Sequence, residues 1–286
     1  MPLEVVPAKP EHVDEMGRIC YEAFKDIHDR HGFQTDFPSV AFTRMVLGGL
    51  VQREDCYMSV ALENGEPVGT NGLLISDEVG GVGPVSVEVP VQGRGIGRAL
   101  MRDVLSYAER NRIEMVRLMQ DSFNMGSLSL YASLGFDTKE PIAMIEPAPA
   151  PCDDGSVRPV MESDLPAIEE LSRRIYRLSR RNEVASLMHP PFRPLLRERD
   201  GRVTGYFILG FPGHGVFETE EDALALVGEA ATGVPAEFAR CFCPLTEGSL
   251  CRGLLAAGGS AIKVMNLMAL GPYEPPDGVW MPSVGF

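Results

Sequence analysis

The spacing of hydrophobic and polar positions changes along the chain, which predicts a protein of mixed α/β class. Apolar residues recur every three to four positions in four segments that we expect to be amphipathic helices, at 11–30, 39–53, 95–111 and 124–134. They alternate or run together in six segments that we expect to be strands, at 3–7, 57–63, 67–75, 82–89, 115–120 and 136–146. Hairpins come first and strand–helix–strand units follow, so the sheet should be antiparallel at one side and parallel at the other.

The second part of the chain repeats the order of the first. Residues 6–24 and 158–176 each show a short strand, a polar turn and an amphipathic helix, and an Asn-Gly turn at 64–65 is matched by an Asp-Gly turn at 200–201. An internal duplication accounts for this, although two unrelated domains that begin alike are the alternative. The remaining segments expected in the second part are hairpin strands within 194–210, helices at 219–231 and 248–257, and strands at 237–243, 261–270 and 279–285.

A stretch without periodicity separates the two parts. Residues 146–156 read EPAPAPCDDGS, in which alternating proline and alanine favour a stiff, extended linker. We therefore predict one domain at 1–147, a linker at 148–155 and a second domain at 156–286.

Composition and charge narrow the functional class. The 286 residues include 26 basic and 40 acidic side chains, a formal net charge of −14, which disfavours a nucleic-acid or anionic-membrane partner. No apolar run approaches the ~20 residues of a membrane span, and the first residues lack the pattern of a signal peptide. Six cysteines are too few for a disulfide scaffold, and no cluster has metal-site spacing. We expect a cytoplasmic protein with no metal, no nucleic-acid partner and no membrane contact.

A glycine-rich turn between a strand and a helix carries the clearest chemical signal. Residues 85–100 read VSVEVPVQGRGIGRAL, and such a turn leaves backbone N–H groups pointing outward at the positive end of the helix dipole. These groups suit a pyrophosphate, although a glycine turn without a ligand is the alternative reading. The lysine and hydroxyl of a nucleoside-triphosphate loop are absent, and G-x-G-x-G does not meet the dinucleotide fingerprint.

Two motifs resemble those of the GCN5-related N-acetyltransferase (GNAT) superfamily. The sequence QGRGIG at 92–97 is similar to its Q/R-x-x-G-x-G/A motif, and NMGSLSLYASLGF at 124–136 is similar to its N-x-x-[AS]-x-x-L-Y-x-x-L-G-F motif. The resemblance covers residues 3–146. It implies two tandem GNAT-like domains, each a mixed, mostly antiparallel sheet flanked by helices, the second of them degenerate.

The resemblance also implies acetyl-CoA as co-substrate. The backbone of the glycine turn would hold the pyrophosphate, the strand before it and Asn124 would meet the pantetheine arm, and Tyr131 would protonate the leaving thiolate. For Asn124 a helix cap, and for Tyr131 a packed aromatic ring, are the alternative roles. The implied cofactor-binding residues are Val87, Val89, Gln92, Gly93, Arg94, Gly95, Ile96, Gly97, Arg98, Asn124 and Tyr131.

The base that deprotonates the acceptor amine is left open by the sequence. Glu88 resembles the strand glutamate that some family members use, and Asp121 follows the predicted strand at 115–120; a water molecule is the third option. Glu88 as a solvent-facing strand residue is the alternative reading. Four acceptor-binding residues are expected in the loop after the first helix, namely Asp26, His28, Asp29 and His31. Asp121 is the fifth.

The second part lacks these motifs. FPGHGVFETEED stands before the helix at 219–231, and its acidic side chains would repel a pyrophosphate, so we expect no acetyl-CoA there. The family's domains finish with two strands after the tyrosine helix, but residues 135–146 leave room for one. We expect a strand from the second part, such as 279–286, to complete the first sheet.

The sequence thus predicts an acyltransferase that moves an acetyl group from acetyl-CoA to a primary amine of a small molecule. An acyl-CoA-binding sensor or scaffold without turnover is the alternative. The acidic surface favours a cationic acceptor, without excluding a neutral amine or a peptide N-terminus, and a homodimer is compatible with the chain.

Overall fold

The computed structural model describes residues 3–246 and 248–285. Its first half, residues 3–146, contains β1 (Glu4–Pro7), α1 (Val13–His31), α2 (Val40–Gln52), β2 (Cys56–Glu63), β3 (Glu66–Leu74), β4 (Val79–Val82), β5 (Ser86–Val87), α3 (Ile96–Arg110), β6 (Met115–Asp121), α4 (Met125–Ser133) and β7 (Asp137–Glu146). The second half, residues 157–285, contains β8 (Val157–Pro159), α5 (Leu165–Ile175), α6 (Arg181–Ser186), β9 (Leu195–Arg199), β10 (Arg202–Phe207), β11 (Gly215–Phe217), α7 (Glu220–Ala231), β12 (Cys241–Pro244), α8 (Gly248–Ala256), β13 (Ser260–Leu270) and β14 (Val279–Met281). None of the described helices is long and apolar enough to cross a membrane.

The predicted strand at 82–89 is wrong in its extent. The chain instead forms two short strands, β4 and β5, and then a 3-10 turn at Val89–Val91. Pro84 lies between the strands and Pro90 lies in the turn, and neither has an N–H group with which to continue a ladder. The other helices and strands expected in the first half are confirmed within a few residues.

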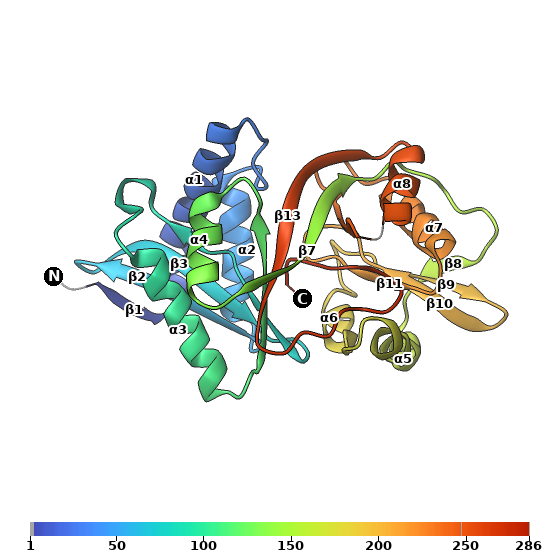
Figure 1. Ribbon diagram of the computed structural model, residues 1–286, viewed down its shortest axis with the longest axis horizontal. Helices are drawn as coiled ribbons and strands as arrows, with labels where there is room; N and C mark the ends of the chain where they lie inside the picture. The colour runs from blue at the N-terminus through green and yellow to red at the C-terminus, as the bar shows by residue number, and fades with distance from the viewer. Residues whose placement is uncertain (1–2, 247, 286) are drawn as a thin grey trace.

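Two strands are exchanged between the halves. The nine-stranded sheet runs β1-β2-β3-β4-β6-β13-β7-β12, with β5 paired to β3, so β13 from the second half lies between β6 and β7 of the first. Strand β7 in turn lies between β13 and β12, both from the second half. Figure 1 shows β7 and β13 side by side where the halves meet. The mixed sheets flanked by helices confirm the predicted fold class.

The strand that completes the first sheet is not the one predicted. Residues 279–285 were expected there, but β14 pairs antiparallel with β11 in the separate five-stranded sheet, ordered β14-β11-β10-β9-β8. The expected segment's last residue, 286, lies outside the described part of the chain. Strand β13 takes the place because its eleven residues reach along both β6 and β7.

The exchanged strand β7 belongs to the core of the second half. Ile142 and Met144 pack with α5 on one face, whereas Ala143 and Ile145 pack with α7 and α8 on the other. Both faces are therefore buried, as alternation along a strand requires when helices cover each side. In the first half α1 and α2 cover one face of the sheet, and α3 and α4 cover the other.

Candidate active site

The first sheet opens into a wedge between β5 and β6. Strand β4 pairs in parallel with β6 only where Val79–Gly81 faces Met115–Arg117. Beyond that point the chain turns into β5, whose two residues pair with Gly69 and Thr70 of β3. In the described part of the chain no strand fills the space between β5 and the last residues of β6. Backbone groups at the wedge are thus left for a ligand.

The glycine turn lies at one end of this wedge and presents free amides. Gly93 and Gly95 have positive φ angles of 77° and 89°, and a Cβ on either would enter open space. Gly95 is the N-cap of α3, a helix of fifteen residues. Over residues 3–246 and 248–285, no protein acceptor receives a backbone N–H from any residue between Gly93 and Arg98. Six consecutive amides without a protein acceptor at a helix N-terminus have the arrangement that suits an anion.

The polar side chains of the turn form hydrogen bonds or ion pairs with other residues of the chain. The Nε2 atom of Gln92 donates to the carbonyl of Val87 over 3.0 Å, and Arg98 donates to Ser133 over 2.9 Å. Arg94 pairs with Glu63 at 2.8 Å. Val89 lies in the 3-10 turn, so of the two valines expected to meet the pantetheine arm only Val87 is in a strand.

Helix α4 places the two residues of the second motif. The Asn124 side chain caps the helix by accepting from the N–H of Ser127 over 3.1 Å. Tyr131, two turns on, is 8% exposed and packs against Phe136. Burial raises the pKa of Tyr131, and the nearby charge of Asp121 raises it further, so the phenol stays protonated and can donate.

Four ionisable side chains meet at the end of β6. The Nζ atom of Lys263, from β13, lies 2.6 Å from Oδ1 of Asp121, 2.7 Å from Oδ2 of Asp36 and 3.1 Å from Nε2 of His28. His28 Nε2 is 3.6 Å from a carboxylate oxygen of each aspartate. None of the four side chains is more than 10% exposed. We call these four residues the acid–lysine cluster.

The surroundings shift the pKa values of the two carboxyl groups of this cluster in opposite directions. Burial raises the pKa of Asp121, and although Lys263 opposes it, the charge of Asp36 adds to the rise. Burial also disfavours ionised Asp36, but the hydrogen bond with His28 and the charge of Lys263 outweigh it and lower the pKa of Asp36. Carboxylates whose pKa values are pushed apart suit different tasks, one as a permanent anion and the other as a proton acceptor.

An aromatic wall stands beside the cluster. The Phe123 ring stacks on Phe33 with centroids 4.5 Å apart, and His31 and His28 lie at 5.1 and 5.2 Å from Phe123. The site therefore joins an apolar surface to buried charges.

Three of the residues expected to bind the acceptor lie outside the acid–lysine cluster, although His31 lies beside Phe123. Asp26, Asp29 and His31 belong to the last turns of α1 and not to a loop, because the helix continues to His31. Asp26 pairs with Arg30, and Asp29 pairs with Lys25, within that helix. Of the four, His28 alone joins the acid–lysine cluster, where Asp121 also lies.

The candidate base Glu88 lies in an ion pair at the start of the glycine turn. Its carboxylate is 2.8 Å from Arg18 on α1, whose guanidinium also binds Glu15 and Glu22. Its side chain is 26% exposed, so water already solvates it in part. The base role of Glu88 stays a prediction.

Sequence reasoning missed Asp36, Phe123 and Lys263. A signal existed for Lys263, because it is the one charged residue in the strand SAIKVMNLMAL at 260–270. A lysine in a mostly apolar strand needs a partner if its side chain is buried. Asp36 lies in an ordinary loop and gave no such signal.

Three members of the cluster also have the spacing of metal ligands. One ligand atom from each of His28, Asp36 and Asp121 lies within 4.8 Å of the others. The Lys263 ammonium lies within hydrogen-bond distance of all three, so it already supplies the positive charge that their arrangement favours.

The matching region of the second half is closed. The N-terminus of α7 is capped by Thr219 and Asp222, and the Asp222 carboxylate also binds Arg199 at 2.9 Å. All three residues of β11 pair with β14, so its outer edge is filled. A pyrophosphate would meet a carboxylate there instead of free amides.

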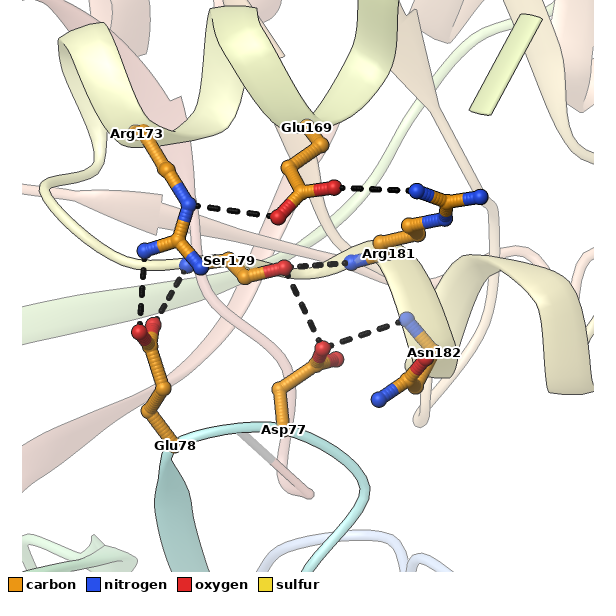
Figure 2. Close-up of a pocket in the computed structure, with 7 residues that line it drawn as sticks. All are labelled: Asp77, Glu78, Glu169, Arg173, Ser179, Arg181 and Asn182. Carbon is orange, nitrogen blue, oxygen red and sulfur yellow. Dashed lines mark hydrogen bonds and ion pairs between the residues drawn. The ribbon is translucent and has the colours of Figure 1, made fainter. Parts of the chain in front are cut away.

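A polar cavity of about 540 Å³ lies at the joint between the halves and does not include the glycine turn. Figure 2 shows Asp77 and Glu78 pointing from the β3–β4 loop toward α5 and α6. Glu78 pairs with Arg173 at 2.9 Å, and Asp77 accepts from the N–H of Asn182 over 3.2 Å. These contacts join the halves.

Comparison with known proteins identifies the first half. A model described as the acetyltransferase (GNAT) family matches residues 18–136. The matched residues are similar to a GNAT domain and include both motifs, at 92–97 and 124–136. An uncharacterized N-acetyltransferase from Methanocaldococcus jannaschii is 31% identical to the chain over 137 residues, 46% of this chain. The match spans 58% of that relative's length.

Solved structures extend the likeness to the second half. A putative acetyltransferase from Pyrococcus horikoshii has a TM-score of 0.79 at 18% identity, covering 99% of this chain and 95% of that one. A tandem GNAT protein from the clavulanic acid biosynthesis pathway has a TM-score of 0.60 at 14% identity, covering 96% and 100%. At such identities the likeness shows the fold alone, and that fold is the tandem GNAT arrangement predicted from the sequence.

Proposed function

We propose that the GNAT domain transfers the acetyl group of acetyl-CoA to a primary amine of a small molecule, by direct attack in a ternary complex. One observation carries the proposal. A wedge between β5 and β6 has free amides after β5 on one side, and Asp121, the last residue of β6, with Tyr131 nearby on the other.

The co-substrate would bind along this wedge. The amides from Gly93 to Arg98 would hold the pyrophosphate, with Arg94 and Arg98 adding positive charge at its edge. The outer edge of β5 at Val87, whose carbonyl also accepts from Gln92, and the side chain of Asn124 would meet the pantetheine arm. The thioester would then lie near Tyr131.

The chemistry follows from the protonation states of Asp121 and Tyr131. The acceptor ammonium gives one proton to Asp121, which later returns it to solvent. The amine nitrogen attacks the thioester carbon, the N–C bond forms and the C–S bond breaks. The thiolate takes the proton of Tyr131, and the second proton leaving nitrogen restores the phenol. The products are one amide, one thiol and one proton.

The site supports Asp121 over Glu88 as the base. Burial gives Asp121 a raised pKa, closer to the working pH of a proton acceptor, whereas Glu88 is held by Arg18 in partly exposed surroundings. The acid–lysine cluster has two carboxyl groups against the one ammonium of Lys263, which supports a cationic acceptor. Phe123 and Phe33 would contact the acceptor's apolar part.

The second half would bind no acetyl-CoA, because Asp222 occupies the N-terminus of its α7. Its part in the reaction would be to complete the first sheet through β13.

Amine-dependent thiol release tests the proposal. The full chain is incubated with acetyl-CoA and a panel containing spermidine, tyramine, glycinamide and a peptide with a free N-terminus. Calorimetry with CoA runs in parallel. Turnover of an amine supports the enzyme. Tight CoA binding with no turnover on any amine supports the sensor or scaffold instead.

A further inference from the structure

We propose that Lys263 is a positioning residue for acetyl transfer, brought by strand exchange from the second half into the acceptor site of the first. There it holds Asp121 in place and keeps it ionised as the proton acceptor. The inference rests on the proposed function and deepens it, because it makes the second half a contributor to the same site.

The fold fixes Lys263 from both sides. Strand β13 is hydrogen-bonded to β6 and to β7, and its Met265 faces Asp121 across the ladder. Lys263 is two residues before Met265, so its side chain leaves the same face of the sheet. The side chain is 1% exposed, and its Nζ reaches the carboxylates of both Asp36 and Asp121.

His28 is the third partner of the ammonium. Its Nδ1 lies 2.7 Å from the carbonyl oxygen of Phe24, which holds the ring in place. Its Nε2 lies 3.1 Å from Nζ of Lys263 and 3.6 Å from a carboxylate oxygen of each aspartate. The ammonium thus has polar partners on three different elements, α1, the loop after α1, and β6.

The charges explain why a cation is needed at this position. The buried carboxylates of Asp36 and Asp121 both lie beside Nζ of Lys263. They repel each other, and without a counter-charge two such groups tend to share a proton. Lys263 offsets this repulsion for both. The charged or titratable groups that face Asp121 are His28 from α1, Asp36 from the loop, Lys263 from β13 and Tyr131 from α4.

The test uses steady-state kinetics of the full chain with acetyl-CoA and the panel amine that is turned over fastest. Values of kcat/KM are measured from pH 5.5 to 9.5 for the wild type, Lys263→Met and Lys263→Arg. Loss of the cation should raise the pKa of Asp121. The acid limb of Lys263→Met should therefore move about 1–3 pH units upward, and its kcat/KM near neutral pH should fall about 100-fold. Lys263→Arg keeps the charge and should stay within about tenfold of the wild type.

A matched pair covers the case in which Lys263→Met fails to fold. Asp36→Asn alone keeps the Lys263–Asp121 contact, and Asp36→Asn with Lys263→Met removes one charge of each sign. The two variants differ only at Lys263, so the double variant should show the higher acid limb and the lower kcat/KM. CoA affinity should be the same in both, since neither residue lies at the glycine turn.

Three results overturn the inference. The first is an unchanged pH profile with full activity in a folded Lys263→Met or in the double variant. The second is a loss of activity that comes with a comparable fold-loss of CoA affinity and a lower melting temperature, which marks a purely structural role. The third is a wild type that turns over no amine, which overturns the proposed function together with the inference. The wild-type assay gives this third result before any variant is compared.

Discussion

The Nζ atom of Lys263 lies 2.6 Å from Oδ1 of Asp121, although the two residues come from different halves of the chain. The contact exists because β13 inserts between β6 and β7. The same exchange buries both faces of β7 in the core of the second half. The two halves therefore share one sheet, and the acid–lysine cluster takes side chains from both.

The first prediction concerns the first half expressed alone. Residues 1–147 lack β13, so the edge of β6 and both faces of β7 would be exposed to water. We expect this fragment to be unfolded or aggregated by circular dichroism and gel filtration, and co-expression with residues 156–286 to restore a soluble complex. A protease site inserted in the linker at 148–155 is the control, and its cleavage should leave the complex folded. A stable, monomeric 1–147 fragment would contradict the shared sheet.

The second prediction concerns Tyr131. Tyr131→Phe removes the proton donor but keeps the ring that packs against Phe136, so kcat should fall by about 100-fold or more while CoA affinity stays the same. Tyr107→Phe is the matched control, since it removes a hydroxyl from α3 of the same domain. Equal activities of the two variants would exclude the acid role of Tyr131.

The third prediction concerns the anion cradle. Gly95→Ala places a Cβ where the pyrophosphate would approach, so the Kd for CoA should rise about tenfold or more, equivalent to about 1.4 kcal/mol. Gly65→Ala is the matched control, because Gly65 has a φ of 86° against 89° for Gly95 and equally open surroundings. Both variants should lose about 1 kcal/mol of unfolding free energy, and only Gly95→Ala should lose CoA affinity. An equal loss of affinity in both would point to strain and not to phosphate contact.

The fourth prediction separates the two candidate bases. Asp121→Asn should lower kcat/KM about 100-fold or more and remove the acid limb of its pH profile. The limb should lie above the ordinary carboxylate range, because burial raises the pKa of Asp121. Glu88→Gln breaks the pair with Arg18 and should change kcat/KM less than tenfold. The reverse ranking would return the base role to Glu88.

The sequence predicted what depends on neighbouring residues. The glycine turn, the helix that follows it, the Asn-Gly hairpin and the cap at Asn124 are set by local steric and hydrogen-bonding preferences, and the tandem repeat follows from similar local patterns. The predicted strand at 82–89 was wrong in its extent because Pro84 interrupts the segment and Pro90 follows it.

The exchange of strands could not be predicted in detail. Residues 142–145 of β7 and most positions of β13 are apolar on both faces. Such patterns indicate that a strand is buried but not which strand lies beside it. The acid–lysine cluster brings together α1, a loop, β6 and β13, and its members are neighbours only after the sheet has formed. The missing strand of the first sheet was inferred from length, which cannot choose between 260–270 and 279–285.

The most direct measurement follows one reaction by two readouts, thiol release and mass spectrometry of the amine, with acetyl-CoA and each panel amine. The account predicts that at least one primary amine gains one acetyl group for each thiol released, at a rate that depends on amine concentration. Thiol release that is absent, or independent of every amine while CoA still binds tightly, would contradict it.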